Sequence, residues 1–335
     1  MNRKLNVEED FQLISEELVK LFSSNYLDKA ARKVSFLQRS SKFKPIDFIS
    51  LCGFFNHYSG TKSLSQLCGI LESKRNISLT TEGLNQRFND TGVSLLRAIF
   101  QELLSKHFLS FTIPSQYQLD IRRLRILDST AFELPVTYIE KYQGYHKSGV
   151  RIQLEYDLLN GEFLHLAVQN GRESDYTFGQ TLSNSIKKHD LIIRDLGYLS
   201  FGVLAEINKR DAYYISRLKT NIVNYVKEDT GFYTKLDLDK IMEEMEIGEV
   251  REIENIYVGK DKMNIPRLIL CKLTDEQTEQ RKKRLQKKEI KKGVKVSHQT
   301  QKLSRLNMFI SNIPYQSIPK EEIQPFYSLR WQIEI

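Results

Sequence analysis

The chain has 335 residues and a net charge of +8, and its content of 40% hydrophobic and 27% charged residues is typical of globular domains and excludes a disordered chain. The N-terminal segment lacks the apolar run of a signal peptide, and no apolar stretch is long enough for a membrane span, so we expect a soluble cytoplasmic protein without a membrane partner. Cys52, Cys68 and Cys271 are too widely spaced to indicate a disulfide framework or a zinc site.

Residues 1–120 predict a helical domain. Apolar residues recur there at helical spacing, and short polar breaks separate the periodic stretches. The three clearest stretches predict helices near residues 11–22, 46–55 and 95–104.

The segment SLTTEGLNQRFND contains a helix start signal. Thr80 or Thr81 can cap a helix that carries Gln86 and Arg87, and the preceding LSQLCGILES is a candidate partner helix. The pair fits either a helix-turn-helix, in which Arg87 would contact DNA, or a plain helical hairpin.

From Arg122 onward the apolar pattern changes to period two. Three strands are expected first, and Asn160-Gly161 supplies a hairpin turn that requires positive φ. Helices and strands then alternate, which predicts an α/β fold with a mixed sheet. The expected elements are strands RLRILD, VRIQLEYDLL and EFLHLAV, a helix over 175–188, strand LIIRD, a helix over 201–209 and strand AYYISRL.

Residues 220–304 interrupt this alternation and are interpreted as an insertion. The β-like pieces EIENIYVG and RLILCKL precede a strongly basic run, after which strand NMFISNI and a final helix starting near Pro325 resume the α/β pattern. The run contains one acid, Glu289, and the rest of the chain is balanced at 41 basic and 41 acidic residues, so the cationic charge is concentrated here. Such a cluster indicates a polyanionic partner, or a solvated helix face. Its basic residues are Arg281, Lys282, Lys283, Arg284, Lys287, Lys288, Lys291, Lys292 and Lys295.

Three carboxylates fall where a metal site is expected. Asp128 ends the first strand in LDST, Asp195 ends the fourth in RDLGY, and Glu334 lies on the final helix. Side chains at strand ends meet at one edge of an open sheet, and oxygen ligands there suit Mg²⁺ or Mn²⁺. Read individually, the two aspartates can also cap turns, and Glu334 can be a solvated helix residue.

The last segment carries a more specific signal. Tyr327, Arg330 and Glu334 are spaced i, i+3 and i+7, which is one face of a helix. Together with LDST and RDLGY, this pattern resembles the DDE transposases of bacterial insertion sequences, in the group with a Tyr-x2-Arg-x3-Glu-x6-Lys signature. The resemblance extends from about residue 32 to the end of the chain. It implies an RNase H-like core with a β-rich insertion before the last catalytic helix.

The resemblance also implies roles for individual residues. Asp128, Asp195 and Glu334 would form the catalytic triad and bind two Mg²⁺ or Mn²⁺ ions, Arg330 would contact a DNA phosphate, and Tyr327 would support Glu334 or the DNA backbone. Trp331 lies off that face and is expected to pack in the core.

Two features depart from the family pattern. The signature lysine would stand seven residues after Glu334, beyond the end of this sequence, so the resemblance implies a chain truncated at its C-terminus. The tryptophan that receives a flipped base in the insertion of relatives has no counterpart here. Tyr225, Phe232, Tyr233 and Tyr257 are substitutes or ordinary core aromatics.

The resulting interpretation is a cut-and-paste transposase that cleaves and joins double-stranded DNA at terminal inverted repeats and in target DNA, with an activity that the expected truncation would impair. It would assemble as a homodimer on DNA in the bacterial cytoplasm, associated with the nucleoid. The alternatives are a non-catalytic DNA-binding regulator of a full-length transposase, and another RNase H-like nuclease. The expected domains are an end-binding helical domain at 1–120, core segments at 121–219 and 305–335, and the insertion at 220–304.

Overall fold

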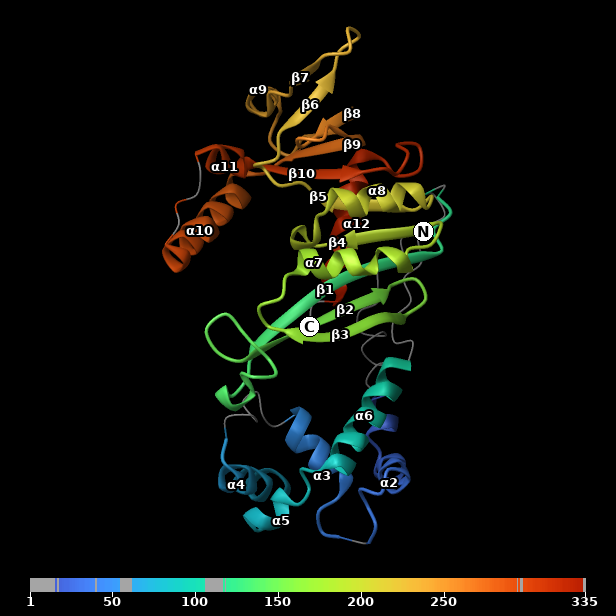
Figure 1. Cartoon of the computed structure of the whole chain (residues 1–335), viewed down its shortest axis with the longest axis vertical. Coiled ribbons are helices and arrows are strands. Elements are labelled where there is room, and N and C mark those ends of the chain that lie inside the picture. Colours follow the sequence, from blue (N-terminus) through green and yellow to red (C-terminus); the bar gives the residue numbers. More distant parts are fainter. Residues whose placement is uncertain are drawn as a thin grey trace. The chain divides into compact units, whose positions relative to one another are not determined.

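The structure, a computed structural model, describes residues 16, 18–39, 41–54, 62–105, 117, 119–293, 295 and 298–333 (Figure 1). The chain divides into two compact units. No helix within the described ranges is long and apolar enough to cross a membrane. The first unit comprises Met1–Ser110, Phe132–Val150 and Asn160–Phe163, and the second comprises Phe111–Ala131, Arg151–Leu159 and Leu164–Ile335.

The first unit is built from short helices around its own hydrophobic core. Helix starts are set by hydroxyl caps: Ser63 accepts a hydrogen bond from Gln66 N, and the Gln66 side chain accepts one from Ser63 N. Leu27, Leu71 and Leu84 are fully buried between the helices. The elements are α2 (Ser24–Lys33), α3 (Pro45–Ile49), a π-helical turn (Ser50–Phe54), α4 (Leu64–Arg75), α5 (Thr81–Asn85) and α6 (Asp90–Ser105).

The predicted helices over 46–55 and 95–104 are confirmed, the first as α3 followed by the π-helical turn. The helix expected over 11–22 lies mostly outside the described residues.

The predicted helix carrying Gln86 and Arg87 is wrong. Thr80 does cap α5, but α5 ends at Asn85, because the side chain of Asn89 accepts from Gly92 N and starts the next helix. Gln86 and Arg87 therefore lie in the turn between α5 and α6, and α5 has only 5 residues.

The second unit is organised on a ten-stranded sheet of order β3-β2-β1-β4-β5-β10-β9-β8-β6-β7, to which the parts of β1, β2 and β3 in the first unit also belong. β1 pairs with β4, and β4 with β5, in parallel, whereas β10 is antiparallel to both β5 and β9. This confirms the predicted α/β class with a mixed sheet. The strands are β1 (Arg123–Glu133), β2 (Gly149–Asp157), β3 (Glu162–Asn170), β4 (Asp190–Arg194), β5 (Tyr213–Arg217), β6 (Asn224–Lys227), β7 (Tyr233–Lys235), β8 (Val250–Val258), β9 (Met263–Lys272) and β10 (Leu306–Ser311).

Register in the sheet explains where the two aspartates lie. The last parallel pair joins Leu127 of β1 to Arg194 of β4, so Asp128 and Asp195 are the residues that directly follow this pair in the chain. β1 continues to Glu133, five residues beyond the predicted end at Asp128, whereas β4 ends before Asp195. Asp128 therefore lies on the strand at the point where its parallel neighbour leaves the sheet.

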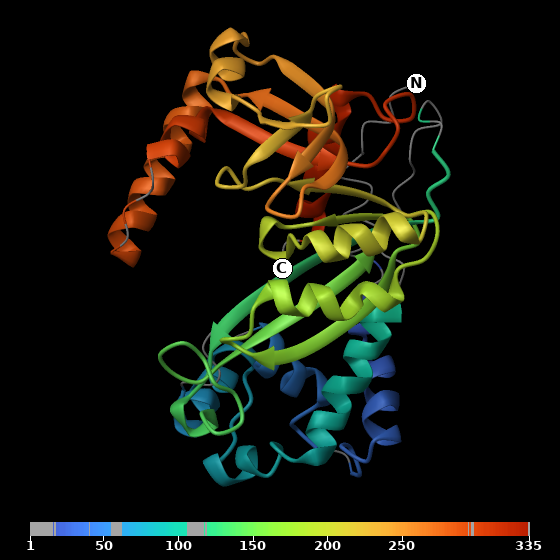
Figure 2. The same cartoon turned by 45° about the horizontal axis from the view of Figure 1, so that its top comes forward.

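Helices cover both faces of the sheet in the second unit. Figure 2 shows α7 and α8 side by side over one face. On β10, Met308 and Ile310 pack in the same core as α8, and Phe309 points to the opposite face, where its ring lies 5.3 Å from that of Tyr327 on α12. The helices are α7 (Asp175–Thr181), α8 (Phe201–Lys209), α9 (Leu238–Glu244), α10 (Asp275–Lys292), α11 (His298–Lys302) and α12 (Lys320–Ser328).

The strands of the expected insertion extend the same sheet. β8 and β9 form a long antiparallel pair, β9 lies directly beside β10, and α10 projects away from the sheet in both views (Figures 1 and 2). α10 begins at the Thr274 cap and ends at Gly293, whose φ of +65° is the left-handed conformation that favours glycine.

Two helix boundaries differ from the prediction. α7 ends at Thr181 and a 3-10 turn (Leu182–Ser185) follows, where Arg123 and Arg125 hold the Ser185 carbonyl. α12 begins at Lys320, not near Pro325, and Pro325 lies inside the helix. From Leu329 to Ile333 the chain is a 3-10 helix, so Tyr327 and Arg330 do not continue one regular α-helical face.

Candidate active site at the ends of two parallel strands

Two of the three predicted acidic residues lie together. The guanidinium of Arg330 donates to Asp128 Oδ2 at 2.8 Å, and its other terminal nitrogen lies 3.9 Å from Asp195 Oδ1. The Asp128 side chain is 20% exposed and that of Asp195 is 45% exposed, so both carboxylates can reach a ligand from solvent. Glu334 lies outside the described residues.

Backbone groups orient each carboxylate. Ser129 N donates to Asp128 Oδ1 at 2.8 Å. Asp195 caps a short 3-10 turn, where its Oδ2 accepts from Gly197 N at 3.4 Å. These backbone contacts fix the orientation of each carboxylate at the sheet edge.

Arg330 and Tyr327 are buried, with 8% and 5% of their surface exposed. Burial raises the pKa of Tyr327 to about 12, with a further contribution from the negative charge of Asp195. Among the described residues neither Tyr327 Oη nor Arg330 Nε has a hydrogen-bond partner. Trp331 was expected in the core, but 58% of it is exposed, and the Arg330 guanidinium lies 5.7 Å from its ring.

Sequence reasoning missed a third aspartate behind this pair. Asp175, the first residue of α7, accepts at Oδ1 from Ser129 Oγ (2.8 Å), Arg151 Nη1 (2.9 Å) and Gln153 Nε2 (3.0 Å). Its only sequence signal was its place at the start of a predicted helix, which indicates a first-turn residue and nothing more.

A buried ion-pair network supports the strands beneath the site. Glu155 of β2 accepts from Arg125 of β1 at 2.6 Å and from Arg194 of β4 at 3.3 Å, and Asp190 accepts from Arg125 at 3.0 Å and from Arg123. Because buried charges require partners, the network ties these strands together at the register that aligns Asp128 with Asp195.

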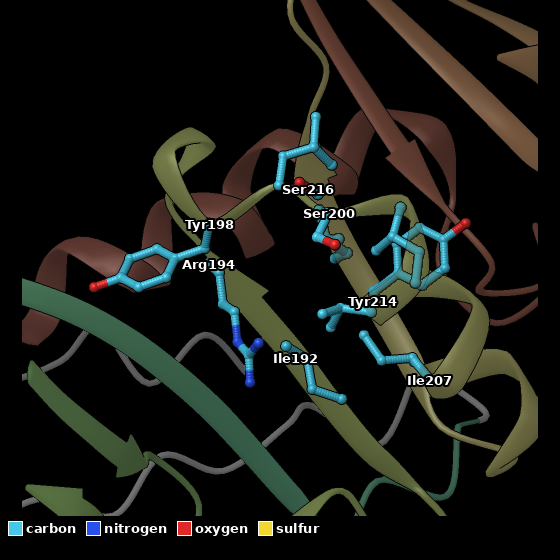
Figure 3. Close-up of a pocket in the computed structure, with 11 residues that line it drawn as sticks. Ile192, Arg194, Tyr198, Ser200, Ile207, Tyr214 and Ser216 are labelled. Atoms are coloured by element: carbon cyan, nitrogen blue, oxygen red, sulfur yellow. The ribbon is translucent and has the colours of Figure 1, made fainter. Parts of the chain in front are cut away.

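A small cavity of about 20 Å³ lies between α8 and the strands β4 and β5 (Figure 3). Arg194 and Tyr198 line one side, Tyr214 and Ile207 line the other, and the Tyr198 hydroxyl points away from Tyr214. That volume admits a water molecule but no substrate, so the cavity belongs to the core rather than to the active site.

The donor set of the site has the chemistry that a divalent cation needs. Asp128 and Asp195 offer hard carboxylate oxygens, which Mg²⁺ and Mn²⁺ prefer, and they lie at an accessible sheet edge. No group of three or more His, Cys, Asp or Glu side chains suited to a metal ion occurs within the described part of the chain, where Glu334 is not included. Two residues fit the ion, and a complete ligand set would require a third.

The predicted DNA-binding residues on α10 divide into two kinds. Lys283, Arg284 and Lys287 are exposed, and Lys282 pairs with Glu279 at 2.7 Å. Arg281 instead donates to the carbonyls of Ser304 and Leu306 and to the side chain of Asn307. Burial, with the nearby Arg217 and Arg284, lowers the pKa of Arg281 to about 10, and these contacts give it a part in the fold. The side chain of Lys288 lies outside what the structure describes.

Arg87, the remaining predicted DNA contact, lies in the first unit. It is half-buried, and its guanidinium carbon is 5.9 Å from the centre of the Phe43 ring. Its role in DNA binding stays a prediction.

Comparison with known proteins identifies the family. A family model described as a transposase DDE domain matches residues 120–335. The transposase for insertion sequence element IS231E of Bacillus thuringiensis subsp. finitimus is 37% identical, in an alignment that covers 99% of this chain and 73% of the relative.

The chain belongs to the DDE transposase family. The transposase for IS231B of Bacillus thuringiensis subsp. berliner is 36% identical with the same coverage, and that for IS1151 of Clostridium perfringens is 28% identical over 100% of this chain and 73% of its own length. The resemblance read from LDST, RDLGY and the Tyr-Arg-Glu spacing is therefore confirmed. A DDE transposase domain implies an RNase H-like fold, and the mixed sheet of this transposase agrees with it.

Proposed function

We propose that this chain is a DNA transposase of an insertion sequence that cuts and joins DNA at terminal inverted repeats by a metal-dependent DDE mechanism. The observation that carries the proposal is the convergence of Asp128 and Asp195, from the ends of the β1 and β4 pairing, under the single guanidinium of Arg330. Family membership supports DNA as the partner.

In this proposal Asp128, Asp195 and Glu334 hold two Mg²⁺ or Mn²⁺ ions. When bound, the ions would activate the attacking oxygen and stabilise the leaving oxygen of the phosphodiester. Asp128 and Asp195 supply ligand oxygens that Ser129 N and Gly197 N have already oriented. Such pre-orientation lowers the entropy lost when the site is assembled.

Arg330 has a separate role in the proposal. Its planar guanidinium can make paired hydrogen bonds to a phosphate, and it lies 2.8 Å from the Asp128 carboxylate, so a bound phosphodiester would be held close to the catalytic oxygens. Tyr327 packs beneath it and limits its movement.

The remaining assignments are proposals of the same kind. Residues 1–120 bind the terminal repeats, with Arg87 as a DNA contact, and the core segments 121–219 and 305–335 carry the chemistry. The insertion at 220–304 contacts DNA through the basic residues Lys282, Lys283, Arg284, Lys287 and Lys288 on α10, whereas Arg281 of the predicted set supports the fold. Two copies assemble on DNA as a homodimer.

The experiment is a strand-cleavage assay of the 335-residue chain with Mg²⁺ or Mn²⁺ on a duplex that carries the terminal repeats of its own element. We expect nicks at the repeat boundary with the wild type and none with Asp128→Asn or Asp195→Asn. Binding to the repeats without cleavage would support a DNA-binding regulator instead. Cleavage of branched DNA regardless of repeat sequence would indicate another RNase H-like nuclease.

A further inference from the structure

Asp175 is connected by hydrogen bonds to strand β1 beside Asp128 and to the turn after Asp195, the two aspartates proposed to bind metal. On one side Ser129 Oγ donates to Asp175 Oδ1 at 2.8 Å, and the backbone N–H of the same serine donates to Asp128 at 2.8 Å. One residue therefore links Asp175 to the Asp128 carboxylate.

The link on the other side passes through a buried glutamine. Gln153 Nε2 donates to Asp175 Oδ1 at 3.0 Å, and Gln153 Oε1 accepts from Tyr198 Oη at 2.6 Å. Tyr198 closes the turn after Asp195, where its N–H donates to the Asp195 carbonyl at 2.9 Å. Gln153 is completely buried and Tyr198 is 3% exposed, so this connection is shielded from water.

The carboxylates of Asp175 and Asp195 both lie close to Gly197. A Cβ on Gly197 would lie 3.4 Å from Asp175 Oδ2 and 3.8 Å from Asp195 Oδ2. The side chains of Asp175 and Asp195 thus flank the glycine of the RDLGY turn.

Two simpler roles do not account for these contacts. A first-turn helix residue needs only the positive end of its own helix, whereas Asp175 takes three donors from β1 and β2. Direct metal ligation does not account for them either, because the three donors on Oδ1 hold Asp175 against β1 and β2, and only Oδ2 faces Gly197. Arg151 also neutralises the charge of Asp175.

We propose that Asp175 is a positioning residue that sets the separation of Asp128 and Asp195 and thereby the affinity of the site for a divalent cation. The inference rests on the proposed function, because it assumes that these two aspartates bind the metal. Residues that hydrogen-bond to metal ligands commonly change metal affinity by about 10- to 100-fold when they are removed.

The test is a titration of the 335-residue chain with Mn²⁺, followed by the electron paramagnetic resonance signal of the free ion. Asp175→Ala is expected to weaken Mn²⁺ binding by about tenfold. Asp175→Asn keeps an oxygen that accepts from Ser129 and Gln153, and is expected to stay within about threefold of the wild type. Ser129→Ala removes the hydroxyl that donates to Asp175 and accepts from Arg151 Nη1 at 3.1 Å, and its effect should fall between those of the two Asp175 variants, which keeps the test decisive if Asp175→Ala fails to fold.

The matched control is Asp47→Ala, which removes a buried first-turn aspartate of α3 that pairs with Arg75 in the first unit and should leave Mn²⁺ affinity unchanged. Unchanged affinity in both Asp175→Ala and Ser129→Ala would overturn the positioning role. Mn²⁺ affinity as low in Asp175→Asn as in Asp175→Ala would also overturn it, because that result would indicate that the Asp175 carboxylate binds the ion directly. If the wild type binds Mn²⁺ no better than Asp128→Asn, the metal assignment of the proposed function fails, and the positioning role fails with it.

Discussion

The Arg330 guanidinium donates a 2.8 Å hydrogen bond to Asp128, a residue 202 positions earlier in the chain. The same guanidinium lies 3.9 Å from Asp195, so one buried cation offsets part of the charge of two neighbouring carboxylates. Those oxygens are the ones proposed to bind metal. The arginine and a divalent cation therefore compete for the same negative charge.

Replacing Arg330 with glutamine should raise the affinity of the site for Mn²⁺. The ion pair is partly exposed and worth roughly 1 kcal/mol, and its loss corresponds to about fivefold tighter Mn²⁺ binding, measured by isothermal titration calorimetry. Affinity for repeat DNA should fall in the same variant, because a phosphate contact is removed. Arg172→Gln, on the surface, is the control. Weaker Mn²⁺ binding in Arg330→Gln would show that the arginine assists the metal rather than competing with it.

The exposed cations of α10 should contribute to DNA affinity in proportion to their charge. We expect the triple variant Lys283→Gln, Arg284→Gln, Lys287→Gln to lower the slope of log affinity against log salt by roughly 2 to 3, because each phosphate contact contributes about 0.9. Fluorescence anisotropy with a repeat duplex at several salt concentrations measures this slope. The thermal midpoint should not change.

Arg281 provides the contrast within the same helix. It holds the carbonyls of Ser304 and Leu306, so Arg281→Gln should lower the thermal midpoint while the salt slope of DNA binding changes little. The reverse pattern would assign Arg281 to DNA and remove its structural role.

The buried pair of Arg267 and Glu252 should stabilise the loop that leads into α12. Arg267 of β9 donates to the carbonyls of Ile313 and Ile318, near the two ends of that loop, and forms a paired contact with Glu252. Arg267→Met leaves the Glu252 carboxylate, 14% exposed, without its partner and should reduce the free energy of unfolding by about 3 kcal/mol, measured by urea denaturation. Adding Glu252→Leu should recover part of the loss. Equal stability of the single and double variants would contradict this account.

Two glycines of the first unit should respond oppositely to alanine. A Cβ on Gly92 would lie 2.6 Å from the Arg87 carbonyl oxygen, whereas Gly69, inside α4, has nothing within 4 Å of that position. Gly92→Ala should destabilise the protein by about 1–3 kcal/mol, because the new methyl group would force the backbone at Gly92 or Arg87 to move. Gly69→Ala should stabilise it by about 1 kcal/mol through helix propensity. Differential scanning calorimetry distinguishes the two, and a neutral Gly92→Ala would refute the steric argument.

Much of the fold follows from local patterns in the sequence. Period-two alternation located β1, β2 and β3, and short apolar runs located β4, β5 and β10. A sheet covered on one face buries alternate side chains, and a sheet covered on both faces buries all of them. The positive φ of 69° at Gly161 confirms the predicted Asn-Gly turn.

Boundaries failed where a distant side chain competes with the helix. The α7 helix stops where arginines of β1 take the Ser185 carbonyl, and α5 stops where Asn89 caps its successor. The arginine contacts are fixed by tertiary packing and are absent from the local pattern, whereas Asn89 is itself a local N-cap signal that the sequence analysis missed.

The candidate site could likewise be predicted from the sequence only in part. Asp128 and Asp195 could be chosen because each follows an apolar strand core, and parallel pairing then brings them together. Asp175 could not, because its significance comes from donors on β1 and β2 that only the folded sheet delivers. Trp331 was assigned to the core because it lies off the face shared by Tyr327 and Arg330, but 58% of it is exposed. Tryptophan is large and is rarely buried completely.

The position of β10 limits how this architecture can change. It lies between β5 and β9 and is hydrogen-bonded on both sides. The segment from 220 to 304 therefore supplies the strand that pairs with one side of β10, the strand that precedes α12. Removing that segment would leave the β10 backbone as an open edge, a surface prone to aggregation. The loops that join these strands can vary in length, whereas any replacement of the strands must keep a strand paired with β10.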